Sequence, residues 1–277
     1  MLISEVFGYG VEDVSELARQ ARSAKHCPFR DSVCTKSNKS DPIGICSLAT
    51  GGEAAALCPV RFLENGRIFR DAARLAFGAE SSYAVFPEIR ILRIESADSQ
   101  RDRKIGKVDF LIGKTDGRSV EDFAAIEVQA SYFSGDSIRP ALRAFLKEGV
   151  LDAAISDRRP DFRSSAQKRL MPQLQLKVPV FRRWGKKFFV VVDTQFFGAL
   201  PTFKPSTMTN SELIWLNYPI RKSGTAYVLS EPKVIGTQWD DVLTSLREGE
   251  APEKEEILSE LQQKLDGRKD RYPVFRT

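Results

Sequence analysis

The sequence AAIEVQASYFSG, residues 124–135, holds two polar side chains inside an otherwise apolar run. Successive side chains of a β-strand point to opposite faces, so Glu127 and Gln129 are predicted to share a face. The alanine, isoleucine and valine residues around them predict a core strand. A carboxylate buried there without a partner is costly. The run therefore predicts that Glu127 has a cation or a hydrogen-bonding partner.

A second carboxylate, Asp109, lies in the preceding apolar run, KVDFLIG. The connection KTDGRS contains an Asp-Gly turn dipeptide, so the two runs are predicted to pair as an antiparallel hairpin. Two carboxylates on neighbouring strands can share Mg²⁺, which polarises a phosphate and activates water. Lys107, two residues before Asp109, is a candidate helper on the same face. By itself the pattern also fits a buried polar pair or a surface hairpin.

All the cysteines lie in one short segment, in the pattern C-x6-C-x11-C-x11-C, and they are Cys27, Cys34, Cys46 and Cys58. Four thiolates at turns suit tetrahedral zinc or iron. Ordinary buried thiols and disulfides are the alternatives, and disulfides would fit an exported protein. His26 is expected to flank this site, although it could replace one sulfur ligand.

The bulk composition is that of a soluble globular protein, with 42% hydrophobic and 29% charged residues in 277. No apolar run is long enough to span a bilayer, and the N-terminus has no basic region typical of a secretory signal. A cytoplasmic location without membrane association is expected. The single histidine excludes mechanisms built on a histidine base, so hydrolysis would depend on carboxylates and hard cations.

The net charge of +5 permits a nucleic-acid partner. Ten basic side chains lie between residues 158 and 187, opposed only by Asp161, and they predict either a solvated face or a phosphate-contacting surface. The basic residues are Arg158, Arg159, Arg163, Lys168, Arg169, Lys177, Arg182, Arg183, Lys186 and Lys187. Gln167, Gln173 and Gln175, in the same stretch, are candidates for reaching base edges.

The order of apolar patterns predicts a compact α/β arrangement. Helices are expected near residues 11–24, 65–80, 136–150 and 249–266, where apolar residues recur at helical spacing. Strands are expected near 83–94, 104–113, 122–130, 186–197 and 211–220.

The cysteine segment followed by Asp109 and Glu127-Val128-Gln129 resembles the NotI-like type II restriction endonucleases of the PD-(D/E)xK superfamily. The resemblance covers roughly residues 20–195. Val108 stands where the superfamily often has proline, and Gln129 stands at its lysine position. The Glu-x-Gln ending is this family's own variant. An additional upstream acidic residue of the family would be Glu88 or Glu95.

The resemblance implies a nuclease core, a mixed central sheet flanked by helices, at residues 63–277. It places a loop-rich metal-binding segment at residues 1–62. The expected catalytic residues are Asp109, Glu127, Gln129 and Glu88, with Mg²⁺ on Asp109 and Glu127. The four cysteines would hold a structural iron, with zinc as the alternative.

The resemblance also implies a homodimer that makes Mg²⁺-dependent double-strand breaks in DNA at a GC-rich palindrome. A cognate methyltransferase would protect the host DNA. Arg30 and Arg61, near the cysteines, would present donors to bases. The alternative interpretation is a non-catalytic DNA-binding regulator with a four-cysteine metal module.

Overall fold

The computed structural model describes residues 2–36, 41–50, 53–94, 103–134, 138–149, 159–161, 165–247 and 252–267. Its centre is a six-stranded mixed sheet in the order β16-β13-β12-β9-β8-β7. These strands are β7 (Tyr83–Ile94), β8 (Arg103–Thr115), β9 (Val120–Val128), β12 (Phe188–Asp193), β13 (Leu213–Tyr218) and β16 (Lys233–Thr237). Strand β9 pairs antiparallel with β8 and parallel with β12. The predicted α/β class and the predicted hairpin are confirmed.

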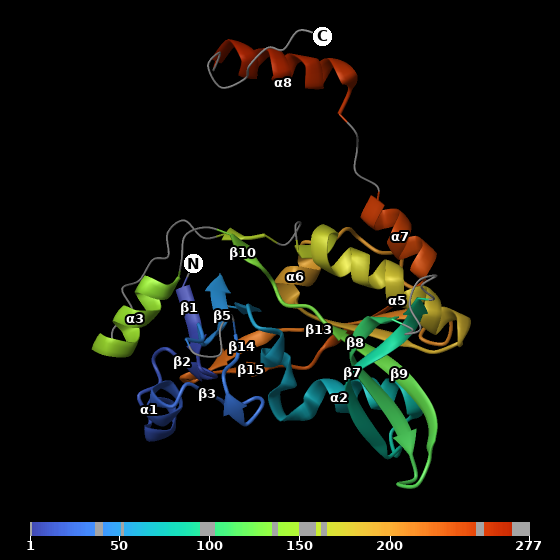
Figure 1. Ribbon diagram of the computed structural model, residues 1–277, viewed down its shortest axis with the longest axis horizontal. Helices are drawn as coiled ribbons and strands as arrows, with labels where there is room; N and C mark the ends of the chain where they lie inside the picture. Colours follow the sequence, from blue (N-terminus) through green and yellow to red (C-terminus); the bar gives the residue numbers. More distant parts are fainter. Residues whose placement is uncertain are drawn as a thin grey trace.

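Helices cover both faces of the central sheet (Figure 1). Helix α2 (Arg67–Phe77) packs on one face, where Ile68 and Ala72 meet Ile112 and Ile126. Helix α5 (Met171–Arg183) packs on the other face. A π-helical turn, η2 (Ala166–Leu170), leads directly into α5. The region of α5 carried no helix in the sequence-based prediction.

A second six-stranded sheet, in the order β15-β14-β6-β5-β1-β2, contains most of the N-terminal strands. Its strands are β1 (Leu2–Val6), β2 (Tyr9–Gly10), β5 (Ile45–Thr50), β6 (Glu53–Ala56), β14 (Ile220–Ser223) and β15 (Ala226–Leu229). The N-terminal segment therefore has more strand than the loop-rich prediction. Its sheet is completed by β14, which pairs with β6 from far along the chain.

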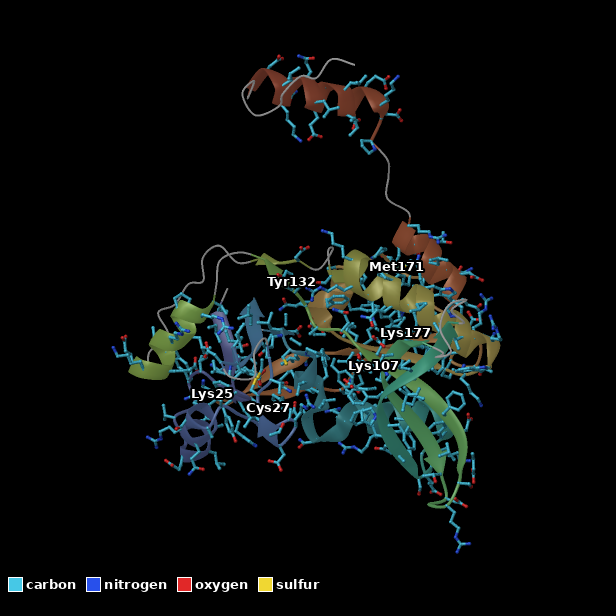
Figure 2. All side chains as sticks on the ribbon, viewed as in Figure 1. Lys25, Cys27, Lys107, Tyr132, Met171 and Lys177 are labelled. Atoms are coloured by element: carbon cyan, nitrogen blue, oxygen red, sulfur yellow. The ribbon has the colours of Figure 1, made fainter. Side chains whose placement is uncertain are left out.

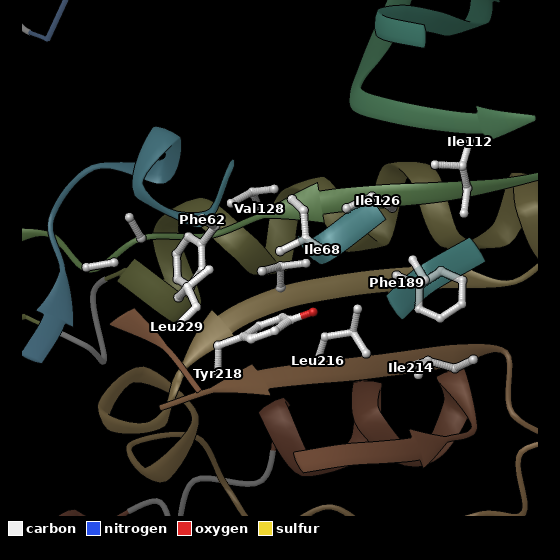
Figure 3. Close-up of a cluster of buried hydrophobic side chains, with 14 of the residues drawn as sticks. Phe62, Ile68, Ile112, Ile126, Val128, Phe189, Ile214, Leu216, Tyr218 and Leu229 are labelled. Atoms are coloured by element: carbon white, nitrogen blue, oxygen red, sulfur yellow. The ribbon is translucent and has the colours of Figure 1, made fainter. Parts of the chain in front are cut away.

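The two sheets share one hydrophobic core (Figure 3). Phe62, which follows the N-terminal strands, lies in the same buried cluster as Val128 of β9 and Leu229 of β15. Hydrogen bonds also join the sheets. Ala56 of β6 accepts from the Ser131 N–H at 2.8 Å, and the Ala56 N–H donates to Asp193 Oδ2 at 2.9 Å. The ends of β9 and β12 are thereby fixed against β6.

The remaining elements are short or peripheral. They are α1 (Glu16–Ser23), β3 (His26–Cys27), β4 (Ser32–Val33), η1 (Pro59–Gly66), β10 (Phe133–Ser134), α3 (Arg139–Glu148), β11 (Arg159–Pro160), α6 (Thr194–Gly198), α7 (Trp239–Arg247) and α8 (Lys254–Gly267). The predicted helices correspond to α1, α2, α3 and α8. None of the helices in the described ranges is long and apolar enough to cross a membrane.

Candidate active site and cysteine cluster

Asp109 occupies the position in β8 where its pairing with β9 stops. The last paired residues are Phe110 and Ile126. One step further, the side chain of Asp109 takes the place of a strand partner, because its Oδ2 accepts the Val128 N–H at 2.9 Å. This bond fixes one oxygen of the carboxylate. Burial raises the pKa of Asp109 above its usual range, while the Val128 N–H and nearby lysines oppose the shift.

Glu127 lies on β9 between β8 and β12, opposite Val190, and is almost completely buried at 1% exposure. Burial raises the pKa of Glu127 to about 7, and repulsion from Asp109 adds to the rise. The two carboxylates are therefore electrostatic neighbours, as the strand pattern predicts. Buried acids with strongly shifted pKa values concentrate at functional sites.

Lys177 of α5 is the direct partner of Glu127. Its Nζ lies 2.8 Å from both Glu127 Oε1 and Oε2, and 2.7 Å from Gln173 Oε1. The lysine is only 2% exposed. Figure 2 shows Lys177 on α5 and Lys107 on β8. Both lysines lower the pKa of Asp109.

The inward position of Lys177 and Gln173 contradicts their assignment to a DNA-facing surface. The signal that could have identified Lys177 is its place in the helix stripe. Leu174, Val178 and Phe181 lie three residues before it and one and four residues after it, and all are buried in one cluster. Because Lys177 falls on the same helix face as these buried residues, its side chain is predicted to point into the core.

Gln129 is buried at 8% exposure, two residues beyond Glu127. Its backbone N–H donates to Val191 O at 2.9 Å, and its Nε2 donates to Ala130 O at 2.7 Å. The hydrogen bonds that the structure gives this residue therefore go to backbone carbonyls, which hold the amide beside the end of β9.

Glu88 lies opposite Asp109 on β7, because the pairs Pro87–Phe110 and Ile89–Val108 flank the two residues. Glu88 has a left-handed φ of 59°, which is unusual for a side chain that is not glycine. Its carboxylate is exposed and lies 2.9 Å from Lys107 Nζ, which lowers the pKa of Glu88. The other upstream candidate, Glu95, falls outside the described residues.

The four cysteines come together although 30 residues lie between the first and the last. Cys27, Cys34 and Cys58 line one pocket of about 270 Å³. Cys46, on β5, lies beside Cys58, because the Cys58 N–H donates to Cys46 O at 3.2 Å. All four are free thiols, so the disulfide alternative is not supported. Burial raises the pKa of Cys27, Cys46 and Cys58.

The chemistry of this donor set fits a thiolate-bound metal such as iron or zinc. The side-chain positions are not closed around one point, however. Across the described ranges, no three His, Cys, Asp or Glu side chains are arranged to hold a metal ion. Lys36 lines the same pocket as Cys27, Cys34 and Cys58, and its ammonium donates to Leu57 O. His26 contacts Asp31 at 3.2 Å on the exposed side, as expected for a residue that flanks the site.

Comparison with known proteins identifies the family. The family model described as restriction endonuclease NotI matches residues 5–229. The chain belongs to the NotI restriction endonuclease family. The match begins within β1 and ends at the last residue of β15, so it spans both sheets except β16. No curated protein matches the chain significantly.

Membership of the NotI family identifies the chain as a restriction endonuclease, a site-specific deoxyribonuclease that binds double-stranded DNA. Two arginines act on the carboxylate of Glu88 in addition to Lys107. Arg30, from the cysteine segment, and Arg90 of β7 both lower the pKa of Glu88. The cysteine segment therefore contributes, through Arg30, to the electrostatics around Glu88.

The basic stretch is only partly available to DNA. Arg169 is exposed and stacks on Tyr132, with its guanidinium carbon 4.3 Å from the ring centre. By contrast, Arg182 pairs with Glu212 and Asp240, and Lys187 donates to backbone carbonyls. Arg158 and Arg163 lie outside the described residues.

The assignment of Arg61 to DNA contact is wrong. Its side chain is fully buried at 0% exposure. It donates to Glu5 Oε2 at 2.7 Å, to Glu64 Oε2 at 2.6 Å and to Tyr227 O at 2.8 Å. Arg61 thus ties the N-terminal sheet together and cannot reach a partner. Arg30, the other arginine predicted to contact bases, is exposed.

Proposed function

We propose that this NotI-family enzyme cuts double-stranded DNA in a Mg²⁺-dependent reaction at a GC-rich palindrome. The observation that carries the proposal is the pair of coupled carboxylates, Asp109 and Glu127, on adjacent strands. Both have raised pKa values because of burial. Two such carboxylates are the ligands that Mg²⁺ takes from a protein when it also binds a phosphate.

Asp109 and Glu127 would hold the ion, which would polarise the scissile phosphate and lower the pKa of a bound water. In the hydrolysis, the water oxygen forms a bond to phosphorus and loses a proton to solvent. The bond from phosphorus to the leaving sugar oxygen breaks, and that oxygen takes up a proton. The Val128 N–H holds Asp109 Oδ2, so Oδ1 would remain available as a ligand for the ion.

Glu88 and Gln129 complete the proposed catalytic set. Glu88 lies opposite Asp109 at the exposed edge, where Lys107 holds its carboxylate. It is suited to bind a water-coordinated ion beside Asp109. Gln129 shares the face of Glu127, and its neutral amide is suited to orient a water rather than to supply charge.

The four cysteines would hold a structural iron, with zinc as the alternative. Support comes from three of the free thiols, Cys27, Cys34 and Cys58, which line one pocket. A metal there would fix the segment that carries Arg30, and bidentate arginine is the commonest specific contact to guanine. Metal content and the visible spectrum of the purified protein would separate one iron from zinc or from a cluster.

A homodimer follows from the palindromic target, because a two-fold protein presents the same surface to each half-site. A cognate methyltransferase that protects the host DNA belongs to the same proposal, and so does action in the cytoplasm. Analytical ultracentrifugation, with and without a palindromic duplex, tests the dimer.

Digestion of a long GC-rich DNA, with Mg²⁺ and with EDTA, tests the proposed reaction. The chain, Glu127→Ala and the matched control Glu121→Ala are compared. Glu121 lies on the same strand, exposed and paired with Lys114. Discrete bands that need Mg²⁺, vanish for Glu127→Ala and persist for Glu121→Ala are expected. Intact DNA that is bound tightly in both buffers would favour the non-catalytic DNA-binding regulator.

A further inference from the structure

The motif of this chain has an amide where the nuclease superfamily has lysine, yet a lysine stands at the site. We propose that Lys177, on α5, supplies the positive charge that the neutral Gln129 cannot supply. Gln173 orients the Lys177 ammonium toward Glu127. The inference rests on the proposed function and names a further residue of the same site. In this arrangement the cation of the motif has moved from the strand to the facing helix.

The geometry of Lys177 is that of a directed contact. Equal distances of 2.8 Å from Nζ to the two Glu127 oxygens place the ammonium in line with the carboxylate. The third contact, 2.7 Å to Gln173 Oε1, comes from one turn earlier on the same helix. Three acceptors match the three donors of an ammonium. The position of Nζ is thus fixed by two elements, β9 and α5.

Stability does not explain a charge at this position. A buried ion pair gains little over apolar residues of similar volume, because both charges lose their hydration. The surroundings of Lys177 are apolar, since Leu174, Val178 and Phe181 are buried beside it. This comparison applies to the pair as a whole, because replacing Lys177 alone would leave Glu127 buried without its counter-ion. A reaction that adds negative charge beside Glu127 would be stabilised by the positive charge of Lys177.

The charges present during hydrolysis match this role. Asp109, Glu127 and the scissile phosphate together carry about three negative charges, and the attacking hydroxide adds another. A divalent cation balances two of them. Lys177 is the buried cation beside Glu127 that can balance part of the remainder. Preorganised charge of this kind is effective because it needs no rearrangement during the reaction.

Lys107 is less suited to the role. It is 46% exposed at the side chain, and its Nζ lies 2.9 Å from Glu88. An exposed charge is screened by water and salt, so it contributes less than a buried one. Lys107 is assigned to holding Glu88.

The test transposes the charge. Lys177→Met keeps the length of the side chain and removes its charge, and Lys177→Met with Gln129→Lys moves the ammonium to the motif position. Lys233→Met, at an exposed position of β16, is the matched control for loss of one lysine. Cleavage by each is followed under single-turnover conditions in Mg²⁺. DNA binding is measured with Ca²⁺ in place of Mg²⁺, and thermal unfolding reports on the fold.

Lys177→Met is expected to slow cleavage about 100-fold or more, while DNA affinity changes less than about threefold. The double variant, Lys177→Met with Gln129→Lys, is expected to cleave at least tenfold faster than Lys177→Met alone. A purely structural role of Lys177 would not produce this recovery. Lys233→Met should cleave at the original rate. Cleavage by Lys177→Met within about fivefold of the original would overturn the inference. A parallel loss of DNA binding would overturn it as well.

If Lys177→Met has no cooperative unfolding transition, Gln173→Leu decides. This variant keeps the Lys177–Glu127 pair and removes the hydrogen bond from the Lys177 ammonium to Gln173 Oε1. A slower cleavage step with unchanged DNA binding supports the inference, and an unchanged step overturns it. If the unsubstituted chain makes no Mg²⁺-dependent cuts, the proposed function itself fails, and that result differs from cleavage that survives Lys177→Met.

Discussion

Arg61→Met separates a structural arginine from a DNA-contacting one. Arg61 is 0% exposed and donates to Glu5, which is itself fully buried. The other Glu5 oxygen, Oε1, has no hydrogen-bond partner among the described side chains and backbone. Methionine would fill much of the space of the arginine stem, but it would leave Glu5 with Ser47 as its hydrogen-bonding partner. The substitution therefore leaves a buried charge without its counter-ion.

Removing one member of a buried ion pair costs about 3–5 kcal/mol. Glu64 adds little, because its side chain is 19% exposed and can be hydrated. For a chain of this size, about 1 kcal/mol corresponds to roughly 2–4 °C in Tm. The expected fall in Tm is therefore about 6–20 °C. This magnitude is far larger than any expected from an exposed arginine.

The loss of stability in Arg61→Met should also depend on pH. Burial raises the pKa of Glu5, and Arg61 opposes that rise. Without Arg61 the folded protein binds the Glu5 proton more tightly than the unfolded chain does. Its stability then falls as the pH rises from about 4.5 through the folded pKa. The difference in Tm between the variant and the original chain should be larger at pH 8 than at pH 5.

Differential scanning calorimetry at both pH values measures the effect, with Arg30→Met as the matched control. Arg30 is exposed, so its replacement should change Tm by less than about 2 °C. Glu5→Gln with Arg61→Met should recover part of the loss, because it removes the unpaired charge. A fall below about 2 °C for Arg61→Met, or loss of cleavage at unchanged Tm, would refute the structural role.

Three further predictions concern the site and the cysteine segment. Asp109→Asn keeps an acceptor for the Val128 N–H, so Tm should hold, while cleavage in gel assays should fall on the order of 10³-fold as several kcal/mol of metal-bound stabilisation are lost. Because burial and then Asp109 raise the pKa of Glu127 to about 7, cleavage at limiting Mg²⁺ should fall about tenfold per pH unit below 7, and a flat profile from pH 5.5 to 8.5 would contradict this. Gly44→Ala should lower the free energy of unfolding, measured in urea, by about 2–5 kcal/mol, because the φ of Gly44 is +69° and a Cβ would lie 2.4 Å from the Phe7 ring. Gly117→Ala is the control and should lower it by about 1 kcal/mol, because the φ of Gly117 is +92° but a Cβ there would meet no neighbouring atom.

The carboxylate pair could be predicted because its determinants are local. Alternation along β9 puts Glu127 and Gln129 on one face, and the Asp-Gly turn sets the pairing with β8. Asp109 then follows from a register of only a few residues. These features need no knowledge of the rest of the chain.

The lysine partner could not be predicted in the same way. Lys177 and Glu127 are 50 positions apart in the sequence, and their contact depends on how α5 packs on the sheet. Prolines at 172 and 179 and the many charges obscured the helix, although its buried stripe continues through Pro179. The tertiary fold also determines which arginine near the cysteines can contact DNA. Arg30 is exposed, whereas Arg61 is buried.

The N-terminal sheet was missed because its partners are distant. Strand β1 is short and contains Ser4 and Glu5, whose burial depends on Ser47 and Arg61. Strand β14 joins β6 across more than 160 residues. Such pairings are set by global packing rather than by local preference.

The position of β14 and β15 in the N-terminal sheet has a consequence for synthesis of the chain. A ribosome makes β6 long before it makes residues 220–229, so the edge that β14 will cover stays open during most of translation. Contacts between distant residues form slowly, and unpaired edges favour aggregation. A nascent chain truncated before residue 220 should therefore depend on chaperones, and the cysteine segment should reach its final setting only after β15 has left the exit tunnel.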